Sequence, residues 1–277
     1  MLKLMYITNK PEIASIADAA GVDRIFIDME YIGKGERQGG LDTVQSHHTV
    51  EDARAVKKVL SNAQLMVRVN PIHDATSEYC STEDEIDAVI DAGADVIMLP
   101  YFKTVKEVER FVKAVDGRVR VFPLLETAKA LECLDSILDV QGIDEIHIGL
   151  NDMSLDLKKK FMFELLADGT VEHICRKLKA KNIPYGFGGI GRLGKGDLPA
   201  EYVIKEHYRL GSTCAILSRS FCNCNLITDL TEIRAVFKNG LRDIREYEEI
   251  CAIASEEDLR NNQKIVIEKV KEISGSR

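Results

Sequence analysis

The sequence predicts an α/β fold, a (β/α)8 TIM barrel with an extra C-terminal helical segment, and three observations support it. Eight short runs rich in Val and Ile alternate with stretches of helical periodicity along the 277 residues. The runs are apolar without interruption, as is typical of strands buried on both faces of a parallel sheet. Several helical stretches end in glycine, for example at Gly21 and Gly93, as helices often do. A doubly wound sheet is the competing fold, because α/β alternation alone does not separate the two.

The expected strands follow one another along the chain, at residues 3–8, 24–29, 64–70, 95–101, 118–126, 144–150, 184–190 and 213–220. Amphipathic helices are expected between them, and a Ser or Thr cap followed by acidic residues marks two of their starts, "STEDE" and "KTVKE". After the last strand, the chain is charged and mostly helical in pattern, and it exceeds what closes a barrel. We therefore expect a catalytic barrel over residues 1–226. A helical extension over residues 227–277 would pack on the barrel or on a neighbouring subunit.

Composition narrows the class of protein. The net charge of -8 and the pI of about 5.4 argue against a nucleic-acid or anionic-membrane partner. No apolar run approaches the roughly 20 residues of a membrane span, and the first residues do not have the pattern of a signal peptide. Seven scattered cysteines, an odd count, indicate reduced thiols and a cytoplasmic location. Cys222 and Cys224 resemble half of a metal site, but no second pair follows at zinc-finger spacing, so we interpret them as buried or idle thiols.

Polar side chains gather where the expected strands end, which is where a barrel places its active site. They are Asp28, Glu30, Arg68, Asn70, Glu126, Asn151, Asp152, Ser218, Arg219 and Ser220. Glu126 and Asp152 follow consecutive strands, and neighbouring strands lie about 4.8 Å apart. The two carboxylates could therefore share one hard divalent ion, Mg²⁺ or Mn²⁺. The alternative is that each carboxylate caps the helix that follows it.

Five motifs, in order, resemble those of the HpcH/HpaI aldolase and citrate lyase β-subunit family: "FIDME", "VRVNP", "VIMLPYFKTVKEVE", "PLLETAKAL" and "HIGLNDMSLDL". The resemblance runs from about residue 24 to residue 157 and continues more weakly through the final strand. It implies a (β/α)8 barrel of metal-dependent carbon–carbon lyases that act through a pyruvate or acyl-thioester enolate. By this resemblance Glu126 and Asp152 are the metal ligands, and Arg68 holds the enolate oxygen and the substrate carboxylate.

The sequence departs from the family pattern at the position of the base. The aldolases of the family usually carry a histidine just after the acidic residue of the second strand, where this chain has Tyr31. The thioester lyases carry an acidic pair there, and Asp28 and Glu30 resemble that pair. His47 and His48 could instead supply an imidazole with a pKa near neutrality, or they could lie in a solvated loop.

A glycine-rich stretch, "PYGFGGIGRLGKGD" at residues 184–197, satisfies two nucleotide-binding patterns. The pattern G-x-G-x-x-G belongs in a first βαβ unit, but here it lies on the seventh strand. The pattern G-x-x-x-x-G-K needs Ser or Thr after the lysine, where Gly196 stands. Barrels often bind phosphate with the loops after strands seven and eight. We expect either a mobile lid or an anion site to which Arg192, Lys195 and Arg219 add positive charge.

These features predict a metal-dependent carbon–carbon lyase, of the class II aldolase type, that forms or cleaves a bond next to a pyruvate enolate. The substrate would be a 2-keto acid, with phosphorylated and sugar-derived acids among the options, and the cofactor Mg²⁺ or Mn²⁺. The alternatives are a lyase for a citryl- or malyl-type coenzyme A thioester and a barrel that binds a metabolite without turnover. Lys158 replaces a usual glycine of the family, which leaves the detailed substrate open. A homo-oligomer is also expected. Catalytic roles are predicted for Arg68, Asp28, Glu30 and His48, and substrate contacts for Arg68, Asn70, Gly188, Gly189, Arg192, Ser218 and Arg219.

Overall fold

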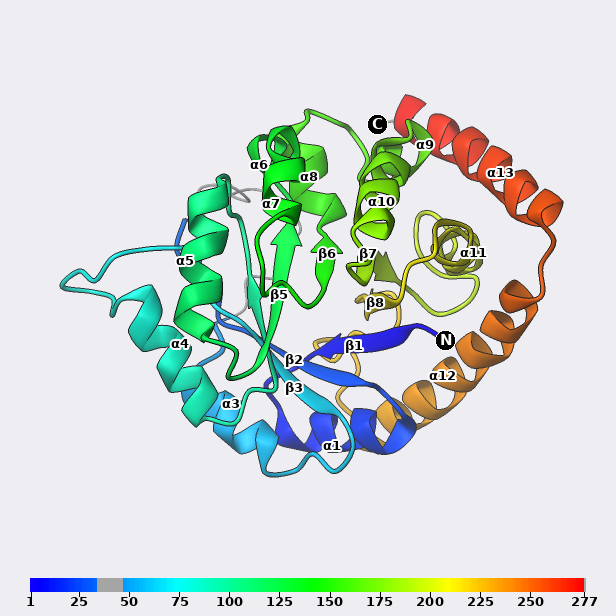
Figure 1. Ribbon diagram of the computed structural model, residues 1–277. Helices are drawn as coiled ribbons and strands as arrows, with labels where there is room; N and C mark the ends of the chain where they lie inside the picture. The colour runs from blue at the N-terminus through cyan, green and yellow to red at the C-terminus, as the bar shows by residue number, and fades with distance from the viewer. Residues whose placement is uncertain (34–46, 277) are drawn as a thin grey trace.

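The computed structural model describes residues 1–33 and 47–276 and shows a closed barrel of parallel strands, each paired with the next along the chain (Figure 1). The last strand pairs with the first, since Met5 lies opposite Ile216, and this closure excludes the doubly wound sheet. The predicted (β/α)8 barrel is confirmed. The strands are β1 (Lys3–Ile7), β2 (Arg24–Asp28), β3 (Gln64–Arg68), β4 (Val96–Leu99), β5 (Arg120–Leu125), β6 (Ile146–Ile148), β7 (Tyr185–Ile190) and β8 (Cys214–Leu217).

Helices surround the barrel, and among the described helices between strands three begin at capping boxes. Thr49, Ser81 and Thr104 each accept a backbone hydrogen bond from the residue three positions on, whose acidic side chain accepts one in return. Such a cap stabilises a helix by about 1 kcal/mol. The helices are α1 (Pro11–Ala20), α3 (Val50–Lys57), α4 (Thr82–Asp91), α5 (Val105–Val115), α6 (Ala128–Glu132), α7 (Leu134–Leu138), α8 (Leu150–Asp156), α9 (Glu164–Ala167), α10 (Thr170–Ala180), α11 (Ala200–Leu210), α12 (Leu230–Ala252) and α13 (Glu256–Gly275).

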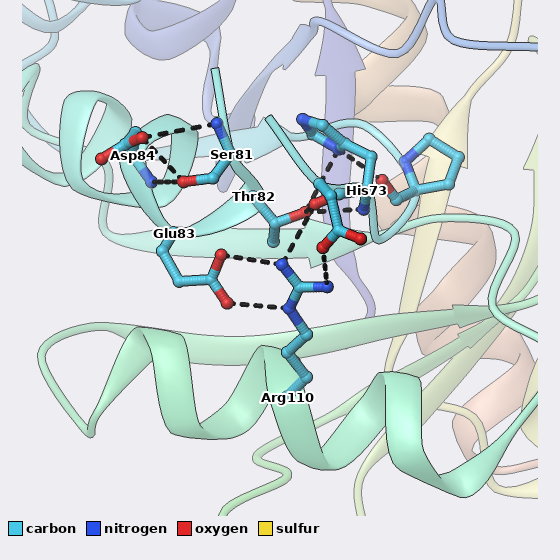
Figure 2. Close-up of polar contacts among 8 residues, drawn as sticks. His73, Ser81, Thr82, Glu83, Asp84 and Arg110 are labelled. Carbon is cyan, nitrogen blue, oxygen red and sulfur yellow. Dashed lines mark hydrogen bonds and ion pairs between the residues drawn. The ribbon is translucent and has the colours of Figure 1, made fainter. Parts of the chain in front are cut away.

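The start of α4 is tied to α5 by a surface ion network (Figure 2). Within the capping box, Ser81 Oγ donates to Asp84 Oδ2 at 2.7 Å. The Arg110 guanidinium reaches across from α5 and donates to both carboxylate oxygens of Glu83, at 2.8 and 2.9 Å. It also donates to the carboxylate of Asp74. Because these side chains are partly exposed, we expect each of their ion pairs to contribute less than about 1 kcal/mol to stability.

The barrel interior is filled by side chains and forms a packed core. Apolar residues that point inward from the strands meet there, and they are Met5, Phe26, Met66, Val96, Met98, Phe122, Leu124 and Cys214. A larger core lies between the strands and the surrounding helices. Side chains at the strand ends therefore stand on a close-packed base, which restricts their positions.

A buried ion pair closes the N-terminal end of the barrel interior. The Arg24 guanidinium is fully buried and donates to both oxygens of Glu145, at 3.0 and 2.6 Å, and to Gln64. Arg120 and Lys3 approach Glu145 from the more exposed rim, at 2.9 and 3.6 Å. Burial alone would raise the pKa of Glu145, but these cations hold it below its usual value.

The C-terminal helices α12 and α13 form an arc along one side of the barrel (Figure 1). Helix α12 packs against α1 and α11, and α13 packs against α11 and α9. Glu248 on α12 accepts the backbone N–H of Leu2 at 2.6 Å, and Asn262 on α13 donates to Glu206 at 2.9 Å. A domain boundary after residue 226 stays a prediction. None of the described helices, these two long ones included, combines the length and the apolar character needed to cross a lipid bilayer.

Candidate active site

Arg68 stands at the centre of a polar cluster at the C-terminal ends of the strands. It is the last residue of β3, and its Nε and Nη2 donate to the two oxygens of Asp28, both at 2.8 Å. Asp28 ends β2 and lies opposite Arg68 in the strand register. Glu30 lies 3.4 Å from Arg68 Nε. Burial opposes the charge on Arg68, but the two carboxylates outweigh it and raise the pKa of the guanidinium.

Glu126 and Asp152 form a second acidic pair at the same end. Glu126 directly follows β5, Asp152 lies in the first turn of α8, and both are buried. Tyr101 donates its backbone N–H to Glu126 Oε1 at 2.8 Å. Gly149 leaves room for Glu126, since a Cβ there would lie 2.9 Å from Oε2. Burial, followed by the charges of Asp152 and Glu30, raises the pKa of Glu126 well above its usual value.

Neither of these carboxylates caps the helix that follows it. The cap of α6 is Thr127, whose side chain accepts the backbone N–H of Ala130. Helix α8 begins at Gly149 without a side-chain cap. Helix capping therefore does not explain the position of Glu126, whereas Asp152 lies in the first turn of α8, where an acidic residue is favourable.

The donor set fits a hard divalent ion. Glu126, Asp152 and Glu30 bring more negative charge into this buried region than Arg68 balances, and a cation between Glu126 and Asp152 would relieve their repulsion. Mg²⁺ commonly binds one or two protein carboxylates and completes its shell with water and substrate oxygens. Residues 1–33 and 47–276 contain no group of three or more His, Cys, Asp or Glu side chains suited to hold a metal. A site with two protein ligands is thus the arrangement that fits.

His48 borders this cluster from the segment before α3. Its Nδ1 accepts the backbone N–H of Asp28 at 3.0 Å. A backbone N–H can only donate, so Nδ1 is unprotonated and the proton of the neutral ring resides on Nε2. The role of His48 as a catalytic base stays a prediction. The neighbouring His47 is exposed.

A pocket of about 280 Å³ opens beside Asp28 and Arg68. The ends of β1, β2, β3 and β8 border it, and Ser218, Arg219 and Lys10 line it. Two of the predicted substrate contacts, Ser218 and Arg219, thus share a pocket with Arg68. The cationic side chains around it favour an anionic ligand.

Asn70 is buried next to the site, and a substrate contact by its side chain stays a prediction. The side chain is 2% exposed. Its Oδ1 accepts the backbone N–H groups of Tyr31 and Ile32, both at 3.0 Å, and its Nδ2 donates to Glu85 at 2.7 Å. With both ends of the amide engaged, Asn70 holds the segment after β2 in place.

The glycines that the sequence analysis assigned to an anion site belong to β7. Gly188 has a φ of 53°, and its carbonyl accepts a hydrogen bond from His147 Nε2 at 3.1 Å. A Cβ at Gly188 would lie 2.7 Å from Leu150, and one at Gly189 would lie 3.3 Å from the carbonyl oxygen of Ile216. Packing within the barrel therefore favours glycine at both positions, and a substrate contact by Gly188 and Gly189 stays a prediction.

Arg192 lies close to α12. Its Cγ is 3.4 Å from the position that a Cβ on Gly240 would take. Its buried Nε has no hydrogen-bond partner among the residues that the structure describes. Lys195 is exposed. Within the described part of the chain, neither side chain lines the pocket beside Arg68, although the charge of Arg192 acts on Cys222, which does, so the substrate contact of Arg192 stays a prediction.

The structure explains how the chain accommodates its two departures from the resembled family. Tyr31 stands at the position of the usual histidine, and burial and Glu85 raise the pKa of its phenol, so it stays protonated near neutral pH. Lys158, at the position of the usual glycine, has a φ of 56°, in the left-handed region that glycine favours. The turn is therefore kept despite the substitution.

Four residues that line the pocket were not predicted from the sequence as part of the site. They are Tyr6 and Lys10, near the end of β1, and Cys222 and Cys224, after β8. The polar run "TNK" directly after β1 was a usable signal, because barrel sites lie at strand ends. The cysteines carried no such signal, since Tyr6, which contacts them, lies more than 200 residues away in the sequence.

Comparison with known proteins shows the family to which this sequence belongs. The sequence model of the family described as HpcH/HpaI aldolase/citrate lyase matches residues 3–183, more than half of the chain. An HpcH/HpaI aldolase from Desulfitobacterium hafniense DCB-2 has a similar structure, with a TM-score of 0.55, 16% identity, and coverage of 88% of this chain and 93% of that one.

Two further solved structures are similar. An HpcH/HpaI aldolase/citrate lyase family protein from Burkholderia cenocepacia J2315 matches with a TM-score of 0.61 at 15% identity, over 84% of this chain and 94% of that one. The citrate synthase SbnG matches with a TM-score of 0.58 at 18% identity, over 84% and 92%. At these identities the structural likeness shows the fold alone. No curated protein sequence matches significantly.

Proposed function

This chain belongs to the HpcH/HpaI aldolase/citrate lyase family, and from that premise we propose that it is a divalent-metal-dependent carbon–carbon lyase acting beside a pyruvate-type enolate. The substrate class we propose is a 2-keto acid. One observation carries the proposal, which is that Glu126 and Asp152 repel each other in a buried site beside the Arg68 guanidinium. That arrangement suits a cation and a developing oxyanion better than it suits an uncharged ligand.

Arg68 would stabilise the enolate. Cleavage of a bond β to a carbonyl leaves negative charge on the former carbonyl oxygen, and a Mg²⁺ or Mn²⁺ ion held by Glu126 and Asp152 would supply Lewis-acid stabilisation there. Arg68 adds charge-assisted hydrogen bonds from the N–H groups that do not face Asp28. Because Asp28 already fixes the plane of the guanidinium, little reorientation is needed when the substrate binds. A donor of this kind typically lowers the barrier by about 3–4 kcal/mol.

In the proposed reaction, a side chain other than Arg68 accepts the substrate proton. The distal hydroxyl of the substrate must lose its proton as the bond breaks, and Asp28 is poorly placed to accept it, because both of its oxygens already accept hydrogen bonds from Arg68. We assign the accepting role to Glu30, which lies within 3.4 Å of Arg68 and whose charge acts on Glu126. His48 lines the same pocket as Asp28 and holds the backbone N–H of Asp28 through Nδ1, so we assign it a positioning role.

A lyase for an acyl-coenzyme A thioester is the second candidate. Asp28 and Glu30 form the acidic pair after β2 that favours it, and Lys10 and Arg219 line the adjoining pocket, where the phosphates of a coenzyme could bind. A barrel that binds a metabolite without turnover is the alternative of another class. One experiment distinguishes the three.

Exchange of methyl protons with D₂O, followed by NMR, tests the proposal without knowledge of the aldehyde partner. Pyruvate and acetyl-CoA would be incubated in parallel with the protein and Mg²⁺ or Mn²⁺, and again with EDTA. We expect exchange of pyruvate that EDTA abolishes. Exchange of acetyl-CoA alone would favour the thioester lyase. If neither compound exchanges although pyruvate binds, the non-catalytic barrel replaces the lyase.

The variant Arg68→Lys tests the guanidinium directly. We expect exchange to slow by about 100-fold or more, because lysine lacks the planar fork that contacts Asp28 and substrate together. The matched control is Arg110→Lys, in which an equivalent contact to two oxygens of Glu83 lies outside the pocket (Figure 2). That variant should stay within about two-fold of the wild type. Equal losses in both variants would mean that the rate reports general damage to the protein.

A further inference from the structure

We propose that Cys224 is a reactive thiol at the C-terminal end of the barrel, which a hydroperoxide oxidises and which Cys222 then joins in a disulfide. Both residues lie in the irregular connection between β8 and α12. Their sulfur atoms are 3.7 Å apart, and Tyr6 Oη on β1 lies 3.0 Å from Cys224 Sγ. To form a disulfide, the two sulfur atoms must approach from 3.7 Å to a bond length of about 2.05 Å. The geometry therefore supplies an attacking sulfur and a resolving sulfur.

The two thiols differ in their access to solvent. Cys222 is 3% exposed, whereas Cys224 is partly exposed and lines the pocket that also contains Arg68 and Lys10. A small oxidant that enters this pocket meets Cys224 first. Redox-sensitive cysteines often have this arrangement, in which an accessible thiol lies beside a resolving one.

The surroundings favour the thiolate form of Cys224. The Cys222 thiol and the Tyr6 hydroxyl can donate to it and the Lys10 ammonium attracts it, so the pKa of Cys224 is lowered to about 6 in spite of burial. The pKa of Cys222 is raised, first by its hydrogen bond to Cys224 and then by burial. Cys224 is thus the attacking sulfur, and Cys222 keeps its proton until the second step.

The other cysteines do not share this environment. Cys80 is exposed, but partial burial and the charge of Glu85 raise the pKa of its thiol. Burial raises the pKa of Cys175 and of Cys214 to about 12. Exposure alone would predict reaction at Cys80, so the comparison of Cys80 with Cys224 separates the two explanations.

The chemistry balances with a hydroperoxide as the oxidant. The Cys224 thiolate attacks one peroxide oxygen, the O–O bond breaks, and the leaving oxyanion takes a proton to give an alcohol or water. The resulting sulfenic acid is attacked by the sulfur of Cys222, the S–O bond breaks, and the Cys222 proton leaves with the hydroxide as water. Two thiols are oxidised to one disulfide, and one hydroperoxide is reduced.

A disulfide at this position would alter the pocket beside Arg68. Tyr6 Oη donates to the carbonyl oxygen of Cys222 at 3.1 Å and also contacts the sulfur of Cys224. Formation of the disulfide would therefore change the contacts of Tyr6 with both cysteines. An effect on lyase activity rests on the proposed function. The thiol chemistry does not, and its tests use chemical readouts.

Alkylation of the full-length protein tests the first step. Iodoacetamide would be applied over a range of pH values, and the labelled peptides quantified by mass spectrometry. We expect the labelling rate of Cys224 to level off above about pH 7 and that of Cys80 to rise beyond about pH 9, because the thiolate is the reacting form. Tyr6→Phe should move the Cys224 profile to higher pH. Coincident profiles for Cys80 and Cys224 in the wild type would overturn the proposal.

Treatment with hydrogen peroxide tests the second step. The peptide that contains Cys222 and Cys224 should lose two hydrogen atoms, and a thiol reductant should restore them. Cys222→Ser should leave a sulfenic acid on Cys224 that dimedone labels, Cys224→Ser should abolish both products, and Cys80→Ser should change neither. Circular dichroism would establish that each variant is folded, and the wild-type alkylation profile decides the question if one is not. Dimedone labelling that prefers Cys80 would contradict the assignment.

Discussion

Both ends of the barrel interior contain buried charged side chains, but cations are in excess at one end and carboxylates at the other. At the N-terminal end, cations surround a single carboxylate: Arg24, Arg120 and Lys3 all lie within 3.6 Å of Glu145. At the C-terminal end, carboxylates surround the Arg68 guanidinium: Asp28, Glu30 and Glu126 act on Arg68, and Asp152 acts on Glu126.

This difference distinguishes a charge cluster that is paired within the protein from the cluster at which we propose that a cation binds. The N-terminal cluster is internally paired, and its surplus cations, Arg120 and Lys3, are about half exposed to water. The C-terminal cluster keeps Glu126 and Asp152 buried in mutual repulsion. Buried groups with strongly perturbed pKa values cluster at functional sites, which is consistent with the proposed cation site. The same Glu-to-Gln substitution should therefore have opposite effects on stability at the two ends.

The largest effect is expected for Glu145→Gln. The substitution leaves the fully buried Arg24 guanidinium without its counter-charge, and breaking a buried pair in this way costs about 3–5 kcal/mol. Urea unfolding, with the free energy of unfolding extrapolated to water, measures the loss. Glu83→Gln is the matched control, because Glu83 also accepts two hydrogen bonds from one arginine, Arg110, but is half exposed (Figure 2). The control should lose less than about 1 kcal/mol, and a similar loss at both positions would contradict the contrast.

At the C-terminal end, Glu126→Gln should stabilise the metal-free protein. Burial and the charges of Asp152 and Glu30 raise the pKa of Glu126, so its ionised form opposes folding at neutral pH. A neutral amide removes that repulsion and still accepts the Tyr101 N–H through its oxygen. We expect a gain of about 1–2 kcal/mol in EDTA, together with loss of metal-dependent pyruvate exchange. Urea unfolding in EDTA checks the sign, and a clear destabilisation would show that the site is balanced without a cation.

His147 lies on β6 between the two ends, and charges from both ends lower the pKa of its ring. Burial, with the charges of Arg24 and Arg68, lowers its pKa to about 4, whereas the unfolded chain keeps the usual value of about 6.5. The unfolded state therefore binds the extra proton, and stability that is complete above pH 6.5 is lost as the pH falls toward 4. The slope is about 1.4 kcal/mol per pH unit for one histidine.

The variant His147→Gln isolates this contribution, since glutamine keeps a donor for the Gly188 carbonyl and does not titrate. Unfolding free energies between pH 6 and pH 5 should fall less steeply than in the wild type, by about 1 kcal/mol per pH unit. His173→Gln, at an exposed helix position, should leave the slope unchanged. Identical slopes for the wild type and His147→Gln would assign the acid sensitivity to other groups.

The fold could be predicted from the sequence because burial on both faces of a strand leaves a local pattern. The four residues of β4 are all apolar and all buried, and the other strands repeat this with few exceptions. The polar strand ends were predictable for the same reason, since parallel strands all present their C-terminal ends at one side. That is why Asp28, Arg68, Glu126 and Asp152 could be grouped before any contact was known.

The parts that could not be predicted depend on pairings between distant segments. Asn70 is a residue type that often contacts substrate, but its side-chain amide forms hydrogen bonds with Tyr31, Ile32 and Glu85. The glycines of β7 have the spacing of a phosphate-binding loop, but close packing of strands also requires residues without a side chain. The spacing is therefore compatible with either explanation. Neither case can be decided from spacing, since the deciding neighbour lies on another element.

The smallest effect concerns the backbone at the two ends. Lys158, just after the helix that carries Asp152, has a φ of 56°, and Asn182, just before β7 at the N-terminal end, has a φ of 55°. Asparagine tolerates the left-handed region, whereas lysine pays a steric cost there. Lys158→Gly should therefore raise the free energy of unfolding by about 0.5–1 kcal/mol, while Asn182→Gly should give no gain, because glycine also adds entropy to the unfolded chain. Differential scanning calorimetry would compare the two melting temperatures. Equal shifts would show that the C-terminal end stores no more backbone strain than the N-terminal end, and would confine the contrast between them to charge.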